Sequence, residues 1–503
     1  MYKPVRLVFL FLILFFGEMF SQTHLQYLIG SGIDSAYNLD LEEAEKIFNK
    51  IIELYPDQPY GYHYIAQNHL WTFLGSKDEG EYQIFKKYSE YAVDKAEDKL
   101  DGDDLNYELH NLLGWAYTLR AMGYTAQGSS LDAFWASKSA VSHFEEALEI
   151  NPEFYDAYLG LGIFDYALSF VPGIFKWALS LTGLSYDKDK GVEYIRIAFR
   201  KGKKCKTEAS FHLAKIYTEY LGEYDSAATH LDRIITKYPR NSLFHYQRAI
   251  LKIDSRNLDA AERSLDMVLK LNNPHFVQTN AFCLFLKGEI YFKRNQFRKA
   301  ADFYNEFIEK TRSIDYTGAA NLKLAICYHI LNDTLESGKH LLLTGLGNPD
   351  IYDDQFAQEE SEYLINNKIT GDYILVVKAK NYLEAGSYDF VRTLLLHSAD
   401  SIADGSIRSE AYIYLSEAEM TLKNYSEAIK CSKKALTLAE GRGKWIIPRT
   451  YFIMAQSYFK ENKNDSAFHY LNKSLDFDDY RSQDKLSPRL FNLKRKLDHA
   501  GKN

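Results

Sequence analysis

The residues that could carry chemistry are 14 histidines, four cysteines and many carboxylates, and their spacing decides what they can do. The histidines show no metal-binding pattern: His63 and His69 are six residues apart, on different faces of a helix, and no H-E-x-x-H motif occurs. Carboxylate pairs such as Glu145 and Glu146 are typical of ordinary, solvent-exposed charge on a helix. Phosphate-binding glycine motifs and G-x-S-x-G are absent from the sequence. The sequence therefore predicts no catalytic, metal or cofactor site, and no enzyme.

The cysteines are too few and too widely separated to form a disulfide framework. Cys283, Cys327 and Cys431 fall inside predicted helices, where a buried thiol is expected. Cys205 lies between two lysines, the one setting in this chain that would lower the pKa of a thiol. A single exposed thiol is weak evidence for a function.

Composition places the chain among ordered globular proteins. The 503 residues are 46% hydrophobic and 15% aromatic, with only 10 prolines, which excludes disordered and collagen-like chains. The net charge of -8 argues against a nucleic-acid partner held by a basic surface.

The N-terminus has the three-part layout of a secretory signal peptide. Lys3 and Arg6 precede an unbroken apolar run from Leu7 to Phe16, and the small residue Ser21 follows. The run is shorter than the roughly 20 residues of a membrane-spanning helix. We expect residues 1–21 to be a signal peptide, cleaved before Gln22; an uncleaved anchor is the alternative. The predicted location is periplasmic, outer-membrane-associated or secreted, and no later segment is long and apolar enough to span a membrane.

A helical pattern recurs along the rest of the chain. A small residue is followed by a bulky one four positions later, an apolar one seven later and often proline twelve later, as in Ala44, Phe48, Ile51 and Pro56. These offsets share one face of a helix. Upstream, a small residue precedes an aromatic one by three positions. The repeating unit is therefore helix, turn, helix over 34 residues.

These features make the chain resemble the tetratricopeptide repeat (TPR) family. Gly288, Tyr291 and Ala300 match the family's small, aromatic and alanine positions, and Ala455, Tyr458 and Ala467 match likewise. The resemblance implies an all-α, right-handed superhelical solenoid of helix-turn-helix repeats, in which small residues let neighbouring helices approach closely. Eleven units are expected, near 25–58, 59–102, 107–153, 154–204, 207–240, 242–275, 281–314, 318–347, 372–405, 409–442 and 448–481.

Three stretches interrupt the 34-residue period. Insertions at 118–139 and 167–190 fall within a first block of repeats, 25–347. An acidic stretch at 348–371, expected to be a solvated connector, separates this from a second block, 372–481, and residues 482–503 are expected to form a C-terminal capping helix.

The insertion at 167–190 is apolar, and Phe170, Phe175 and Trp177 are its predicted contact surface. An extra helix packed on the solenoid is the preferred interpretation; a lid, or a peripheral contact with a partner or membrane, is the alternative. The insertion is also similar to a segment of a eukaryotic repeat family at the mitochondrial outer membrane, through Ser169 to Pro172, Gly183, Leu184 and Asp187 to Gly191.

In the TPR family, the fifth, ninth and twelfth residues of each first helix line the concave surface, here called the inner face. No unit has the lysine and asparagine pair with which some members bind a terminal carboxylate. The inner face instead carries apolar and aromatic residues, which favour a peptide held in side-chain pockets, although neighbouring helices could cover many of them. The predicted partner-binding residues are Leu159, Tyr166, Phe211, Tyr246, Phe285, Phe292, Ile413, Phe452 and Phe459.

The predicted function is a non-enzymatic protein-protein interaction scaffold of the cell envelope, with a protein or peptide partner and no cofactor. The alternative is an envelope enzyme or cell-wall-binding factor with a site around 167–190. Fold alone does not decide between them.

Overall fold

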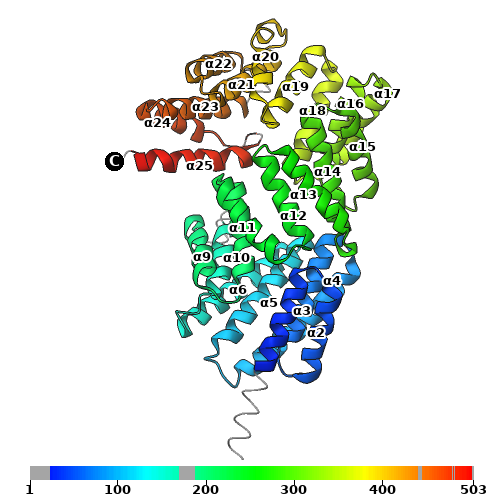
Figure 1. Cartoon of the computed structure of the whole chain (residues 1–503), viewed down its shortest axis with the longest axis vertical. Coiled ribbons are helices and arrows are strands. Elements are labelled where there is room, and N and C mark those ends of the chain that lie inside the picture. The colour runs from blue at the N-terminus through cyan, green and yellow to red at the C-terminus, as the bar shows by residue number, and fades with distance from the viewer. Residues whose placement is uncertain (1–22, 169–186, 440–444, 479, 481, 501–503) are drawn as a thin grey trace, which may run out of the picture. The chain divides into compact units, whose positions relative to one another are not determined.

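The computed structural model describes residues 23–168, 187–439, 445–478, 480 and 482–500, and nearly all of them are helical or in short turns (Figure 1). No strand occurs within these residues. Consecutive helices pair with one another, so the all-α, TPR-like solenoid expected from the repeats is confirmed. The predicted signal peptide, and Phe170, Phe175 and Trp177, lie outside the described residues. Among the described helices, none has the length and apolar character needed to cross a membrane.

The chain divides into two compact units. Unit 1 holds the described residues up to Ala214 together with Thr229–Phe244 and Asn273–Val277, and unit 2 holds Lys215–Ala228, His245–Asn272 and the residues from Gln278 onward. The sequence predicted a boundary between two blocks of repeats at residues 348–371, whereas those residues lie wholly within unit 2.

The helices up to the start of unit 2 follow the predicted pairs closely. Residues 23–37 are helical. The next helices are α2 (Leu41–Leu54), α3 (Tyr60–Ser76), α4 (Glu79–Leu100), α5 (Tyr107–Ala126), α6 (Ser130–Ile150), α7 (Ala157–Leu168), α9 (Lys188–Lys201) and α10 (Lys206–Ile216).

A π-helical turn, η1 (Tyr217–Leu221), continues from α10. The later helices are α11 (Tyr224–Lys237), α12 (Ser242–Asp254), α13 (Leu258–Leu271), η2 (Pro274–Phe276), α14 (Val277–Lys293), α15 (Phe297–Lys310), α16 (Thr317–Ile330), α17 (Thr334–Leu343), η3 (Thr344–Leu346), α18 (Tyr352–Asn367), α19 (Gly371–Glu384), α20 (Tyr388–Leu395), η4 (Ala399–Ser401), α21 (Gly405–Thr421), α22 (Tyr425–Leu438), α23 (Ile446–Lys460), α24 (Asn464–Leu475) and α25 (Gln483–Ala500).

The small residues of the repeat lie where two helices touch. A Cβ atom added to Gly288 of α14 would lie 2.6 Å from the ring of Tyr304 on α15. In unit 1, a Cβ atom on Gly160 would lie 2.2 Å from the ring of Phe144. Both rings are fully buried, so the glycines let a large aromatic side chain fill the gap between adjacent helices, within a repeat for Gly288 and between neighbouring repeats for Gly160.

Two of the interruptions of the repeat, 118–139 and 348–371, consist largely of helices. Residues 118–139 lengthen α5 and α6, which are joined by a short turn at Gly128, a residue with a positive φ of 75°. The acidic stretch predicted as a solvated connector contains α18, which packs against α16. The carboxylate of Asp354 accepts hydrogen bonds from the backbone N–H groups of Tyr316, Ala319 and Asn348 at 2.8 Å each. That carboxylate is therefore a structural link rather than a solvated charge.

Candidate functional site

The predicted partner-binding residues all lie on first helices of repeats, but their exposure differs. Tyr166, Phe211, Tyr246 and Phe459 are half-buried. The buried members are Leu159, Phe285, Phe292, Ile413 and Phe452. Only the half-buried four can offer ring surface to another molecule, and a binding role for any of the nine stays a prediction.

Aromatic packing within the repeats explains much of this burial. The ring of Phe285 lies 5.3 Å from that of Phe307 and 5.1 Å from that of Tyr316, measured between centroids. The ammonium group of Lys323 lies 4.2 Å from the ring centroid of Phe292. These side chains therefore stabilise unit 2 itself.

The C-terminal helix α25 packs against residues of the last repeats of unit 2 that were predicted to line the inner face. Its leucines recur at intervals of four, three and four, on one side of the helix, and all are buried: Leu486, Leu490, Leu493 and Leu497. They belong to the same hydrophobic cluster as Ile413 of α21 and Phe452 of α23. The guanidinium of Arg489 lies 4.9 Å from the ring centroid of Phe452. An amphipathic helix of this chain thus lies on a surface predicted to bind a partner segment.

A buried carboxylate anchors this arrangement. Glu417, the ninth residue of its repeat, is 1% exposed, and its oxygens lie 2.7 Å from Arg256, 2.7 Å from Arg449 and 3.5 Å from Arg489 of α25. Burial acts to raise the pKa of Glu417, but the three guanidinium groups outweigh it and hold the pKa well below its usual range. The carboxylate is therefore ionised and links α21 to α23, to α25 and to the turn that follows α12.

A second charge cluster occupies another ninth position of unit 2. Lys293 of α14 lies 2.9 Å from Glu289 and 3.0 Å from Glu384 of α19. Burial opposes the charged form of Glu289, yet Lys293, Lys323 and the Tyr304 hydroxyl together lower its pKa to about 2. All of these groups are paired, so the cluster offers no free charge for chemistry.

The structure corrects the expectation for Cys205. The side chain is buried, and burial together with the carboxylate of Asp156 raises the pKa of the thiol, whereas its two lysine neighbours in sequence would lower it. Asp156 accepts hydrogen bonds from the backbone N–H groups of Lys203, Lys204 and Cys205 at 2.9, 2.9 and 3.0 Å. The thiol is therefore not activated.

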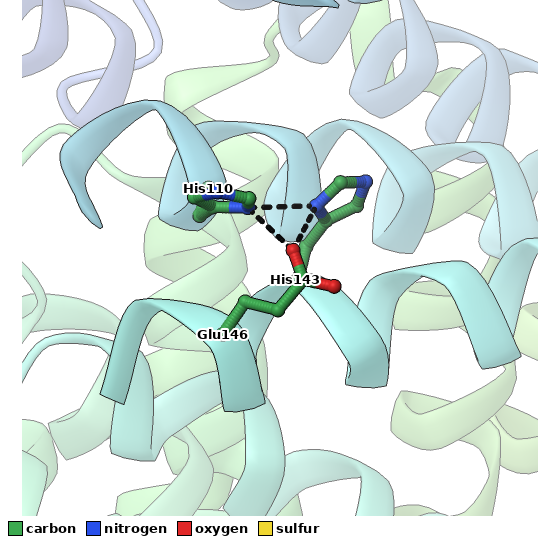
Figure 2. Close-up of side chains that lie close together, drawn as sticks. All are labelled: His110, His143 and Glu146. Atoms are coloured by element: carbon green, nitrogen blue, oxygen red, sulfur yellow. Dashed lines mark hydrogen bonds and ion pairs between the residues drawn. The ribbon is translucent and has the colours of Figure 1, made fainter. Parts of the chain in front are cut away.

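Three side chains that the sequence did not bring together converge in unit 1. His110 lies near the start of α5, and His143 and Glu146 lie on the second half of α6, which runs antiparallel to α5 (Figure 2). The Nδ1 atom of His110 lies 3.1 Å from Nδ1 of His143 and 2.8 Å from Oε2 of Glu146. The distance from Nδ1 of His143 to the same Glu146 oxygen is 3.7 Å.

The surroundings fix the orientation of one imidazole ring and lower the pKa of the other. On the far side of the His110 ring, Nε2 lies 3.1 Å from the backbone carbonyl oxygen of Asp104, an acceptor that requires a proton on Nε2. Burial and the neighbouring His110 lower the pKa of His143, outweighing the opposite effect of Glu146. The group thus presents two imidazole nitrogens and one carboxylate oxygen to a common point.

Sequence reasoning missed this cluster because its parts come from two helices. The i, i+3 spacing of His143 and Glu146 was a local signal, since it places both on one helical face. His110 precedes His143 by 33 residues, and only the register of α5 against α6 brings them together. The prediction that no metal-binding pattern is present took account of spacing along the sequence alone.

Comparisons with known proteins identify the repeats. A family model described as Iml2/Tetratricopeptide repeat protein 39 matches residues 80–315, and two tetratricopeptide repeat models match residues 409–441 and 33–57. No curated protein matches the chain.

Solved structures with similar architecture include yeast Tom70, with 15% identity over 90% of this chain and 99% of that chain, at a TM-score of 0.30. The human IFIT1 dimer with m7Gppp-AAAA has 16% identity, with 83% of this chain and 95% of that chain covered, at a TM-score of 0.38. The TPR domain of P58(IPK) also matches, at 16% identity over 87% of this chain and 99% of that one, with a TM-score of 0.22. Similarity at this level concerns the fold alone.

Proposed function

Because the chain is a tetratricopeptide-repeat protein with an Iml2/Tetratricopeptide repeat protein 39 segment at residues 80–315, we propose that it is a non-enzymatic protein-interaction scaffold of the cell envelope. It binds a segment of a partner protein on the inner face of its repeats. The repeat fold supports protein binding in general. The residues predicted to line the inner face support the more specific proposal that a partner segment binds there.

The observation that carries the proposal is the position of α25. Its four buried leucines share a hydrophobic cluster with Ile413 and Phe452, and Arg489 lies beside Glu417. Ile413, Phe452 and Glu417 occupy the repeat positions predicted to line the inner face. The inner face of this chain is therefore compatible with an amphipathic helix that presents an apolar stripe and a basic residue. Helix-in-groove binding recurs among protein complexes, with anchors at i, i+3, i+4 and i+7. We infer that the partner contributes a helix of this kind.

The contact points for such a helix are the half-buried aromatic residues of first helices. Phe211 on α10 and Tyr166 on α7 lie in unit 1, and Phe459 on α23 and Tyr246 on α12 lie in unit 2. Aromatic rings of this type supply much of the binding energy at protein interfaces when a partner covers them. The net charge of -8 supports a protein partner over a nucleic acid.

Site-specific photo-crosslinking in the native cell tests this proposal. A photoreactive phenylalanine analogue replaces Phe211 or Phe459, and a matched control replaces Phe390, which is 62% exposed on α20, a second helix. We expect a protein adduct of defined mass from Phe211 or Phe459 and none from Phe390. Adducts from Phe390 alone, or from none of the three positions, would contradict binding at the inner face.

Export is the second part of the proposal, and it rests on the sequence of residues 1–21. Lys3 and Arg6, the apolar run Leu7 to Phe16 and the small residue Ser21 support cleavage before Gln22. Cell fractionation combined with N-terminal sequencing tests it. We expect a chain that starts at Gln22 outside the cytoplasm; an intact Met1 chain confined to the cytoplasmic fraction would exclude export.

A further inference from the structure

We propose that His110, His143 and Glu146 bind one divalent transition-metal ion, and that Zn²⁺ is the ion that fits best. Two imidazole nitrogens and one carboxylate oxygen form a donor set known from zinc sites with an open fourth position. Imidazole ligands favour zinc, copper, nickel and iron, whereas calcium and magnesium require oxygen ligands. The site lies on the α5–α6 hairpin of unit 1 and is independent of the proposed partner-binding function.

The geometry suits a single ion. The three donor atoms are separated by 2.8, 3.1 and 3.7 Å. In a tetrahedral zinc site with bonds of roughly 2.0–2.1 Å, neighbouring donor atoms lie about 3.3 Å apart. The observed distances bracket this value, so small rotations of the side chains would place all three donors at bonding distance from one point.

The surrounding residues hold the donors in place. The carbonyl oxygen of Asp104 accepts the Nε2 proton of His110, which holds the ring with Nδ1 directed toward the other two donors. The ring of His143 stacks on that of Tyr117, with an angle of 11° between their planes and 5.7 Å between centroids. The Ser142 hydroxyl lies 3.3 Å from Oε1 of Glu146, which leaves Oε2 directed at the histidines. Each donor thus has a second contact that fixes its orientation.

A water-accessible position remains for the fourth ligand. His110 and Glu146 line a cavity of about 300 Å³, whose wall also includes Asp104 and Glu149. Glu146 is 44% exposed and His143 is 20% exposed, so an ion can reach the site from solvent. The neighbouring carboxylates add negative potential that attracts a cation.

The other histidine and carboxylate groups of the described chain do not converge in this way. His69 contacts two carboxylates, but Glu81 lies at Nδ1 and Glu45 at Nε2, on opposite sides of the ring. One ion cannot contact both partners of His69 together with a nitrogen of its ring. His69 is therefore a matched control: a half-buried histidine of unit 1 with carboxylate neighbours and no common ligand point.

Metal titration of the chelator-treated full chain tests the proposal. Isothermal titration with Zn²⁺, and the visible absorption of Co²⁺ as a spectroscopic probe, report stoichiometry, affinity and nitrogen ligation. We expect one ion per chain and a rise in melting temperature on Zn²⁺ addition, because a ligand of the folded state stabilises it. Calcium should give neither signal.

Variants locate the ion. His110→Ala and His143→Ala should each weaken Zn²⁺ affinity at least tenfold, and Glu146→Gln should weaken it less, because an amide oxygen still coordinates. His69→Gln should bind as the wild type does. If His110→Ala loses its helical circular dichroism, the more exposed His143 decides the outcome. No saturable binding by the wild type, or equal affinity in folded His143→Ala, would overturn the proposal.

Discussion

Glu208 in unit 1 shows how burial of a single carboxyl makes stability depend on pH. Burial raises its pKa to about 7; the hydroxyl of Tyr37 partly opposes this shift, and Asp156 adds to it. The folded state therefore holds a proton that the unfolded chain loses near its ordinary pKa, so unit 1 loses stability as the pH rises from about 4.5 to 7.

The variant Glu208→Gln should remove this pH dependence. The amide oxygen can still accept a hydrogen bond from Tyr37, but no charge is buried at high pH. We expect the variant to be more stable than the wild type at pH 8 by about 1–3 kcal/mol, and equal to it below about pH 4.5. Urea unfolding at both pH values measures the difference, and a variant that is less stable at pH 8 would refute this description of Glu208.

The Glu417 cluster predicts a large loss of stability on substitution. Glu417→Gln would leave Arg256, Arg449 and Arg489 close together without a counter-charge, and breaking a buried pair in this way costs about 3–5 kcal/mol. The wild-type contribution should be present above about pH 4.5 and should be lost as acid protonates Glu417, because its folded pKa is lowered.

A matched surface variant separates this effect from a general loss of charge. Glu427 is 39% exposed and lies 3.3 Å from Lys430 one helical turn away. Exposed pairs contribute at most about 1 kcal/mol, so Glu427→Gln should change stability little. Chemical unfolding followed by hydrogen exchange in α21 and α23 compares the two variants. Similar stabilities for both would show that Glu417 does not anchor α25.

At the residue scale, the sequence identified side chains but not their partners. Cys205 has two lysine neighbours in the sequence, yet its thiol is buried beside Asp156, which lies 49 residues earlier in the turn before α7. His110 and His143 meet through the register of two helices. Such contacts depend on how helices pack against one another, and this packing cannot be predicted directly from a single sequence.

At the scale of the element, the small-residue positions test the packing of a helix pair. Gly288→Ala would place a methyl carbon 2.6 Å from the buried ring of Tyr304, and we expect a loss of about 1–3 kcal/mol. Gly338 on α17 has no atom within 4 Å of an added Cβ, so Gly338→Ala should stabilise the protein by about 0.5–1 kcal/mol through helix propensity.

Thermal and urea unfolding measure the change in stability of the two glycine variants. We expect a loss of stability for Gly288→Ala and a gain for Gly338→Ala. The comparison controls for helix propensity, because both substitutions replace glycine by alanine within an α-helix. If Gly288→Ala stabilised the protein as much as Gly338→Ala, close approach of α14 and α15 at that position would be excluded.

Helices and their pairing were largely predictable from the sequence, because periodic apolar residues and small residues act locally. The pattern that opens at Ala44 and the pair Gly288 and Ala300 fall on paired helices as expected. The stretch 348–371 was harder to predict, since its acidic residues suggested solvent exposure. Burial of Ala357 and Leu364 and the backbone contacts of Asp354 make α18 part of unit 2.

At the scale of the whole molecule, the chain is an array of helix pairs in two compact units, each with inner-face aromatic residues of its own. The burial of five of the nine predicted binding residues reflects a dual use of the repeat positions, since the same side chains pack the helices and line the inner face. The sequence could not distinguish the residues that pack the helices from those that line the inner face, because the same apolar pattern produces both. Binding should therefore depend on the half-buried residues.

The most direct measurement of the central claim is the affinity for the partner captured by photo-crosslinking. Surface-immobilised wild type is compared with Phe211→Ala, Phe459→Ala and the control Phe390→Ala, each first shown to have wild-type helicity. Binding at the inner face predicts a Kd at least about fivefold higher for Phe211→Ala or Phe459→Ala, since loss of a covered aromatic ring costs about 1 kcal/mol or more, often about 2 kcal/mol. Phe390→Ala should bind as the wild type does. Unchanged affinity in both inner-face variants would contradict the account, whether or not Phe390→Ala weakens binding.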